Sequence, residues 1–147
     1  MNSGPSNFLI PEIETFFKDC PNIELEIPCD LNWKSDDWLY SEIKKFDIGI
    51  SPIIDHPFNE AKSAFKAKQY LSVGVPTIAS DVGENRVFVE HRKNGLLCKN
   101  GTGFISLINY IDTLDDDAYF EMSNYALEKR NKFSVGNYCK VLIDRCN

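Results

Sequence analysis

The segment from Asp47 to Ser80 constrains the fold of this chain more than any other part of the sequence. Its first part, 47–53, is an apolar run ended by a proline, which predicts a buried strand. The part over 63–73 predicts a helix that stops at Gly74, with Pro76 just beyond. A second short strand, Thr77 to Ser80, follows at once. A helix that joins two strands in this way predicts a parallel α/β sheet.

The flanking sequence continues the alternation of strands and helices. Before the segment we expect a helix over 8–20 and a half-buried strand over 23–27, followed by a helix that is capped by Asp36 or Asp37 and runs to about Phe46. After it we expect a loop with a short helix over 81–92, a strand over 95–98, and three helices that begin near residue 104, at 115 or 116, and at 134. The pattern predicts one α/β domain, 1–147, with an open, doubly wound and mostly parallel sheet and a helical C-terminus.

Composition excludes several classes of function. The net charge of −6 and the isoelectric point of about 4.9 argue against non-specific nucleic-acid binding, which needs a basic surface. A local cluster of lysines can still bind phosphate in an acidic protein. The five cysteines form no Cys-x-x-Cys pair, which favours reduced thiols in a cytoplasmic protein. No apolar run approaches the roughly 20 residues of a membrane span, and the polar N-terminus lacks the apolar stretch of a signal peptide.

The start of the helix over 63–73 is the segment that offers chemistry. Ser63 is its predicted N-cap, and the first turn of a helix presents free N–H groups and the positive end of the helix dipole, which bind phosphate. Lys62 and Lys66 are four residues apart, so we expect one face to carry two cations. Gln69 lies on the same side and can donate and accept hydrogen bonds, as a ribose diol requires. Taken alone, these residues are also explained by a solvated helix face.

Three other patterns in the sequence do not predict a site. The acidic triplet Asp115–Asp117 lies between two amphipathic helices, so we interpret it as the acid-rich start of the second helix and expect no metal there. His56 and His91 are far apart and lack partners at zinc-ligand spacing. No Gly-x-Gly-x-x-Gly fingerprint occurs, so no nicotinamide or other cofactor is expected.

Four motifs occur in one order along the chain. They are Phe-Asp-Ile-Gly-Ile-Ser-Pro over 46–52, Lys62-Ser63 with Lys66, Gly-Val-Pro-Thr-Ile-Ala-Ser-Asp-Val-Gly over 74–83, and Asn-Gly-Leu-Leu over 94–97. In this order and spacing the chain resembles the C-terminal domain of GT-B glycosyltransferases of the group-1 family (family 4 of the glycosyltransferase classification). The resemblance covers roughly residues 8–145. It implies a Rossmann-like half that binds a nucleotide-sugar donor.

The resemblance also implies which residues hold the donor diphosphate. In the family, the start of this helix performs that task. Carried over, the diphosphate-binding residues are Lys62, Ser63, Ala64, Phe65 and Lys66, the middle pair through backbone N–H groups.

The ribose-binding position departs from the common family pattern. Many members carry two glutamates, separated by seven residues, just before Gly-Val-Pro. Here these positions fall on Ala61 and Gln69, and Glu60 is one residue out of register. We expect Gln69 to take the ribose, with the single acceptor oxygen of an amide. Ile53 and Ile54 are placed to flank the base, and Gly83 and Asn85 are further candidates for donor contact, with Gly83 needed for backbone geometry.

The resemblance implies an incomplete enzyme. In the family, the acceptor side of the active site comes from an N-terminal domain, and the C-terminal domain opens with a central strand and a glycine loop; neither is found in this sequence. We therefore expect retaining, metal-independent sugar transfer to an unknown glycan or lipid acceptor, completed by a missing N-terminal domain or a second chain. The full enzyme would be cytoplasmic or membrane-peripheral. The alternatives are a non-catalytic α/β module that binds a nucleotide or a partner, and, more weakly, a phosphosugar epimerase of related architecture.

Overall fold

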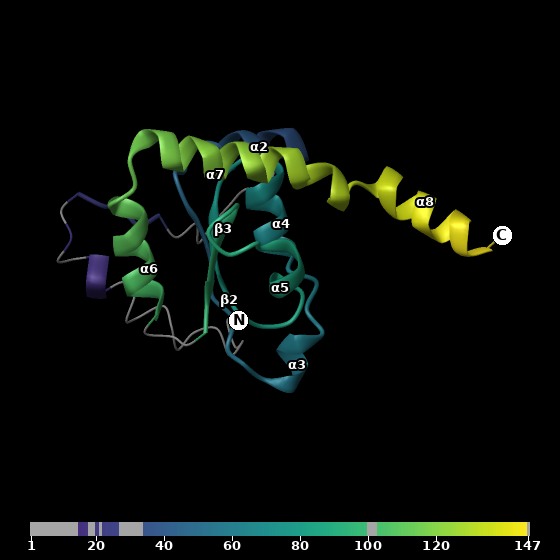
Figure 1. Ribbon diagram of the computed structural model, residues 1–147, viewed down its shortest axis with the longest axis horizontal. Coiled ribbons are helices and arrows are strands. Elements are labelled where there is room, and N and C mark those ends of the chain that lie inside the picture. The colour runs from purple at the N-terminus through teal and green to yellow at the C-terminus, as the bar shows by residue number, and fades with distance from the viewer. Residues whose placement is uncertain (1–14, 18–19, 21, 27–33, 100–102, 147) are drawn as a thin grey trace.

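Three parallel strands form the centre of the computed structural model, which describes residues 15–17, 20, 22–26, 34–99 and 103–146 (Figure 1). The strands are β1 (Gly49–Ser51), β2 (Thr77–Ser80) and β3 (Gly95–Cys98), in the order β1-β2-β3. The helices are α2 (Asp36–Ile43), α3 (Pro57–Glu60), α4 (Phe65–Ser72), α5 (Asn85–Phe88), α6 (Gly103–Asp112), α7 (Asp116–Lys129), the 3-10 helix η2 (Arg130–Phe133) and α8 (Val135–Cys146).

The strands predicted at 77–80 and 95–98 are confirmed, the one predicted over 47–53 is confirmed over the shorter range Gly49–Ser51, and all three run parallel as predicted. Gly49 pairs with Thr77, which in turn pairs with Gly95. The Thr77 hydroxyl also donates a hydrogen bond of 2.9 Å to the carbonyl of Gly49. Because Thr77 is fully buried, this bond satisfies a polar group in the core and joins β1 to β2.

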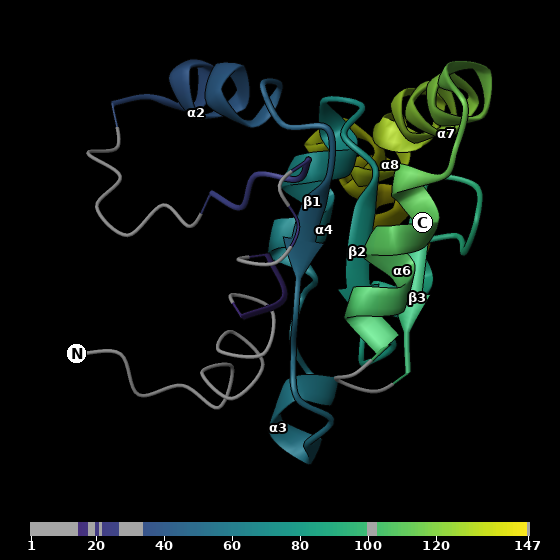
Figure 2. The same cartoon turned by 90° about the vertical axis from the view of Figure 1, so that its left-hand side faces the viewer.

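Both faces of the sheet are covered, which confirms the predicted doubly wound α/β architecture. Alternate residues of β2 point to opposite faces. Ile78 packs with Phe104 and Ile108 of α6, whereas the next residue, Ala79, packs with Leu71 of α4. Figure 2 shows α6 on one side of the strands and α4 on the other.

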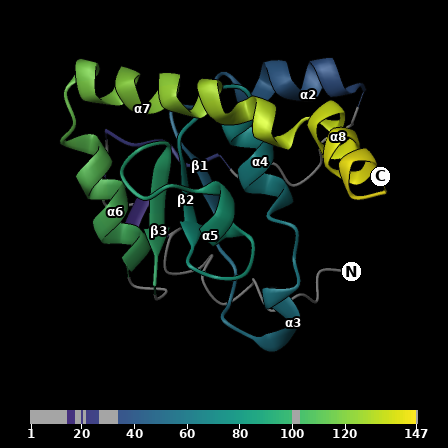
Figure 3. The ribbon, with the colours of Figure 1, turned by 45° about the vertical axis from the view of Figure 1, so that its right-hand side comes forward.

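The two ends of the sheet carry different elements. The chain leaves the carboxyl end of β1 towards α3 and α4, whereas α2 precedes β1 at the opposite end. In Figures 1 and 3, α3 and α2 therefore lie at opposite ends of the molecule. Open parallel sheets bind their ligands outside the carboxyl ends of the strands, which here is the end with α3.

The N-terminal part differs from the prediction. Residues 23–26 form no strand, so the strand predicted over 23–27 is wrong for its described part. Ile23 and Leu25 are nevertheless half-buried against the core, between exposed Glu24 and Glu26. The alternating pattern thus marks burial without pairing to the sheet. Of the helix predicted over 8–20, residues 15–17 are helical, and its other positions, apart from Cys20, lie outside the described residues, as does Ile27.

The helix caps follow the sequence in part. Ser35 caps α2 by accepting a hydrogen bond of 3.2 Å from the N–H of Trp38, so the prediction of Asp36 or Asp37 is wrong; both acids lie in the first turn. Asp115 caps α7 by accepting 2.8 Å from the N–H of Ala118. The acidic triplet is therefore the start of a helix, as predicted.

The C-terminal region is helical, as predicted, through α6, α7 and α8. Figure 3 shows α8 extending away from the sheet beyond the end of α7. None of the helices in the described ranges is long and apolar enough to cross a membrane.

Candidate functional site

The start of α4 differs in detail from the prediction. Ala64 precedes the helix with φ 50° and ψ 33°, a left-handed conformation, and no side chain caps the helix in the part of the chain that the structure describes. The prediction of Ser63 as the N-cap is therefore wrong. Lys62 donates its N–H to the carbonyl of Asn59 at 3.1 Å, so it belongs to the turn after α3. The helical spacing expected for Lys62 and Lys66 does not hold, because the chain changes direction at Ala64.

The side chains of this segment face solvent, except for Ala64. Lys62, Ser63 and Lys66 are exposed, and Phe65 is 66% exposed, whereas Ala64 is 4% exposed and packs in the core beside α4. The ammonium of Lys62 lies 5.6 Å from the ring centroid of Phe58 on α3. This contact keeps one cation near the turn that leads into α4.

Lys66 and Gln69 lie three residues apart within α4 and therefore share a face of the helix. Gln69 is half-buried, whereas Lys66 is exposed. The predicted diphosphate and ribose residues thus follow one another along α4, away from its start.

The electrostatics of the α4 start suit an anion. The first hydrogen bond within α4 runs from the N–H of Lys68 to the carbonyl of Ala64 at 3.0 Å, so the N–H groups of residues 65–67 precede the helical ladder. Helices α2 and α7 carry two acids each in their first turns, but α4 carries none there and has Lys66 instead. A basic side chain at the positive end of the dipole is unfavourable until an anion neutralises it.

The loop after β2 approaches the end of α3 closely. Gly83 has a positive φ of 57°, and a Cβ atom on it would lie 2.8 Å from the carbonyl oxygen of Glu60 and 2.9 Å from that of Asn59. The N–H of Gly83 donates a hydrogen bond of 3.0 Å to the carboxylate of Glu60. The predicted geometric role of Gly83 is confirmed, and its N–H is used within the protein.

Asn85 lies beneath the surface. The residue is 1% exposed, and its Nδ2 donates a hydrogen bond of 3.0 Å to the carbonyl of Ser80. Its Oδ1 has no hydrogen-bond partner among the described residues. The hydroxyl of Ser80 accepts a hydrogen bond of 2.7 Å from the N–H of Ile53. The carbonyl of Ile54 accepts one of 2.7 Å from Asn59 Nδ2. Buried amides and hydroxyls therefore hold the carboxyl ends of β1 and β2 together.

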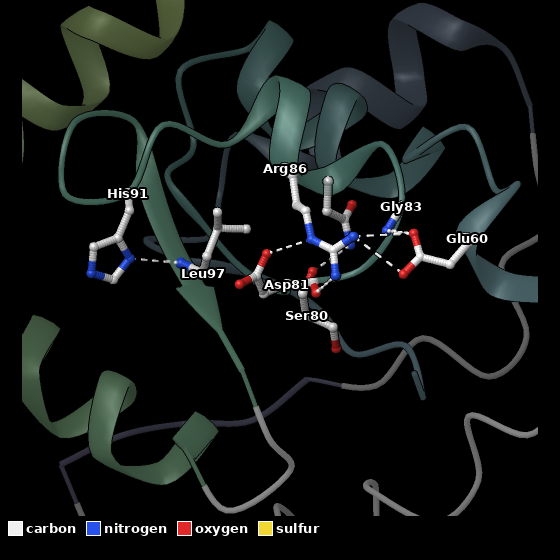
Figure 4. Close-up of polar contacts among 8 residues, drawn as sticks. Glu60, Ser80, Asp81, Gly83, Arg86, His91 and Leu97 are labelled. Atoms are coloured by element: carbon white, nitrogen blue, oxygen red, sulfur yellow. Dashed lines mark hydrogen bonds and ion pairs between the residues drawn. The ribbon is translucent and has the colours of Figure 1, made fainter. Parts of the chain in front are cut away.

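An ion cluster at this end of the sheet was missed by sequence reasoning. Arg86 on α5 donates from Nε to Asp81 Oδ1 at 2.8 Å and from an Nη atom to the Asp81 carbonyl at 2.6 Å, and its other Nη lies 3.1 Å from the carboxylate of Glu60 (Figure 4). The hydrogen bond with Asp81, followed by that with Glu60, raises the pKa of Arg86 above its ordinary value. Glu60 and Arg86 are 26 residues apart, so local patterns carried no signal of the pair.

A second pair joins α4 to the same loop. The ammonium of Lys68 lies 3.1 Å from the carboxylate of Glu84 and 4.1 Å from the ring centroid of Phe88. Lys68 is therefore occupied within the protein and is a weaker candidate for phosphate binding than Lys66.

The two histidines have local structural partners. His56 accepts a hydrogen bond of 3.2 Å from the N–H of Phe58 and caps α3. His91 accepts 2.9 Å from the N–H of Leu97 on β3 (Figure 4).

Two hollows open on the described surface away from these residues. One of about 250 Å³ is lined by residues that include Arg92, Tyr110 and Tyr125, and one of about 590 Å³ by residues that include Tyr40, Val73 and Arg130. Neither is lined by a predicted site residue. The start of α4 lies outside both hollows, and the side chains of Lys62, Ser63, Phe65 and Lys66 are exposed there.

Comparison with solved structures finds similar folds. HepE of Anabaena, solved in complex with UDP, matches 71% of this chain with a TM-score of 0.55 and 16% identity. Sucrose-phosphate synthase of Thermosynechococcus elongatus matches 99% of the chain with a TM-score of 0.61 and 15% identity. The C-terminal domain of LpcC, a group 1 glycosyl transferase of Francisella tularensis, matches 90% with a TM-score of 0.58 and 14% identity. No protein-family model and no curated protein matches the sequence.

The matches cover unequal shares of the other proteins. This chain spans 28% of HepE, 36% of the sucrose-phosphate synthase and 66% of the LpcC domain. At these identities the likeness establishes the fold alone. The chain has the α/β fold of a Rossmann-like half of a GT-B glycosyltransferase.

Proposed function

We propose that this chain is the donor-binding half of a glycosyltransferase that transfers a sugar from a nucleoside-diphosphate sugar with retention. The start of α4 binds the donor diphosphate, and Gln69 binds the ribose. The acceptor side of the active site comes from another domain or chain. A complex of HepE with UDP is among the structures with a similar fold, which supports a nucleotide-diphosphate ligand.

The uncapped start of α4 is the observation that carries the proposal. Its N–H groups lack a side-chain cap among the described residues, and the exposed Lys66 raises the positive potential there. This start lies towards the carboxyl ends of the strands, where open α/β sheets bind ligands. An anion placed there would satisfy the N–H groups and neutralise the lysine together.

The same groups would act on the reaction. Cleavage of the sugar–phosphate bond leaves negative charge on the departing diphosphate. Positioned N–H groups and ammonium groups stabilise charge that develops in the transition state. Lys62, Lys66 and the first turn of α4 would supply that stabilisation without a metal ion. The open surface at the start of α4 would then be one wall of a cleft whose other wall belongs to the acceptor-binding domain.

Titration calorimetry at low salt tests the proposal. UDP, GDP and inorganic pyrophosphate should each bind saturably, with the nucleotides tighter than pyrophosphate if the ribose contact exists. Lys66→Ala should weaken binding of all three about tenfold, because it removes a charged partner of the phosphate. Gln69→Ala should weaken the binding of UDP and GDP and leave the binding of pyrophosphate unchanged.

Lys45→Ala is the matched control. Lys45 follows α2 at the opposite end of the molecule, where it pairs with Glu42 at 2.7 Å. Its removal changes the net charge as Lys66→Ala does and should leave binding unchanged. An absence of saturable binding to the wild-type chain would refute the proposal, as would equal effects of the two lysine variants.

A non-catalytic module that binds a nucleotide is the second candidate. The observation in its favour is Gln69, which stands where many relatives carry a ribose-binding glutamate. Nucleotide binding without sugar transfer, measured with the companion domain or chain present, would favour this candidate over the enzyme.

A further inference from the structure

Arg86 connects two segments that are distant in the sequence. One of its partners is Asp81, directly after β2, and the other is Glu60, the last residue of α3. A planar guanidinium with five N–H groups can bind two carboxylates at once, which a lysine ammonium does with less directional control. Figure 4 shows Arg86 between Asp81 and Glu60.

Glu60 is held from a second side by the backbone. The carboxylate oxygen Oε2 accepts both from Arg86, at 3.1 Å, and from the N–H of Gly83, at 3.0 Å. The carbonyls of Asn59 and Glu60 also lie so close to Gly83 that no Cβ fits between them. The end of α3 is therefore fixed against the loop after β2 by side chain, backbone and close packing.

The end of α3 leads directly into the candidate phosphate site. Between Glu60 and α4 the chain has four residues, 61–64, and Lys62 is tied back to Asn59 by its N–H. A short segment fixed at both ends has little freedom. The position of Glu60 therefore sets where Lys62 lies relative to the first turn of α4.

Charge gives Arg86 a second effect. Glu60 lies five residues before the first residue of α4, and an unpaired carboxylate near that start would repel a diphosphate. Arg86, which it shares with Asp81, and the N–H of Gly83 offset part of the charge of this carboxylate and hold it towards the loop after β2. Loss of Arg86 would both release the segment and free a negative charge.

We propose that Arg86 is a positioning residue for the phosphate site: by holding Glu60 against Asp81 and Gly83, it fixes the segment 61–64 in the arrangement that binds phosphate. This inference rests on the proposed function of the α4 start. Arg86 itself does not contact the ligand; it acts through Glu60.

The test is pyrophosphate affinity of the whole chain, measured by calorimetry well below the melting temperature of each variant. Arg86→Ala should weaken binding about tenfold, because small displacements of binding groups have large effects. Arg86→Lys should have an intermediate affinity for pyrophosphate, since lysine keeps the positive charge but lacks the planar guanidinium that can bind two carboxylates at once. Glu60→Gln should weaken binding less than Arg86→Ala, because its amide oxygen still accepts from Gly83.

The double variant separates positioning from general damage. Because both residues act through one contact, the effects of Glu60→Gln and Arg86→Ala should combine to less than their sum. Hydrogen exchange of the amides of Gly83 and of residues 61–64 should accelerate in Arg86→Ala, while that of β2 stays slow. Glu42→Gln removes a carboxylate from an exposed pair on α2 and should change neither measurement.

Each outcome decides between the hypotheses. Wild-type affinity in Arg86→Ala, with Lys66→Ala still weakened, would overturn the positioning role and leave the phosphate site standing. Fully additive effects, or exchange that accelerates equally throughout the chain, would also overturn it. No pyrophosphate binding by the wild-type chain would overturn the proposed function, and this inference with it.

Discussion

The ring of Tyr70 on α4 lies directly over Gly49 of β1, so that a Cβ atom on Gly49 would meet the ring carbons of Tyr70. Burial raises the pKa of the Tyr70 hydroxyl above its ordinary value. The absent side chain at Gly49 thus sets how closely α4 approaches β1. It thereby helps to place the start of α4 relative to the sheet.

Gly49→Ala should destabilise the protein by about 1–3 kcal/mol, as expected for overpacking at a tight contact. The cause is displacement of the Tyr70 ring, and chemical denaturation measures the free energy of unfolding. Gly136→Ala on α8 is the control, since a Cβ there meets nothing within 4 Å. It should be neutral or slightly stabilising, because alanine favours helix. Equal losses in the two variants would contradict the overpacking explanation.

Ser80→Ala should destabilise the protein by about 1–3 kcal/mol, because it leaves the N–H of Ile53 without its buried acceptor. Ser41→Ala provides the comparison. Ser41 is exposed and donates to the carbonyl of Trp38 on α2, so its loss should cost little. Thermal unfolding checks both variants, and a similar melting temperature for Ser80→Ala and the wild type would refute the role of this bond.

The acid side of the stability profile should depend on Tyr125. Its hydroxyl donates a hydrogen bond of 2.6 Å to the carboxylate of Glu90. This bond is the largest of several causes that lower the pKa of Glu90 below its ordinary value of 4.5. A lowered pKa in the folded state stabilises the protein above the pKa of the unfolded state. That stabilisation is lost as the pH falls through the folded value. Tyr125→Phe should therefore be less stable than the wild type at neutral pH, by a margin that shrinks below about pH 4.5.

Tyr119→Phe is the matched control for this pH dependence. The Tyr119 hydroxyl donates 3.0 Å to the carbonyl of Asp47, an acceptor that does not titrate. The difference in free energy of unfolding between Tyr119→Phe and the wild type should therefore stay constant over the same acid range. Urea unfolding at each pH measures the difference in free energy of unfolding between each variant and the wild type. A difference that stays constant with pH for Tyr125→Phe as well would contradict the assignment to Glu90.

Salt should weaken pyrophosphate binding through the exposed lysine of α4. Ions screen exposed charges over about 8 Å at physiological ionic strength. We expect affinity to fall as salt rises, and Lys66→Ala to show a flatter dependence than the wild type. Lys45→Ala should retain the wild-type slope. Calorimetry across a salt series measures this, and identical slopes for all three proteins would argue against a role for Lys66.

Much of the architecture follows from local patterns in the sequence. The strand–helix–strand segment predicted parallel pairing, and the stop of α4 is confirmed at Gly74, whose φ is 82°. The acid-rich start of α7 could also be predicted from the sequence, since Asp115 caps the helix by accepting a hydrogen bond from Ala118, only three residues along the chain. The pattern over 23–27 failed because alternation reports burial, and a strand further requires a neighbouring strand to pair with.

Local patterns in the sequence determined the order of the strands and helices from residue 36 onwards, because these depend on residues within a few positions of one another. Together with the family resemblance, they also predicted residues 62–66 as a candidate phosphate site and Gln69 as a ribose contact. Tertiary structure alone decided how that segment is held. The left-handed Ala64 and the contact between Glu60 and Arg86 arise where α3, α4 and the loop after β2 pack together. Such contacts join residues distant along the chain, so they leave no periodic signal, and only the packed fold brings them within hydrogen-bonding distance.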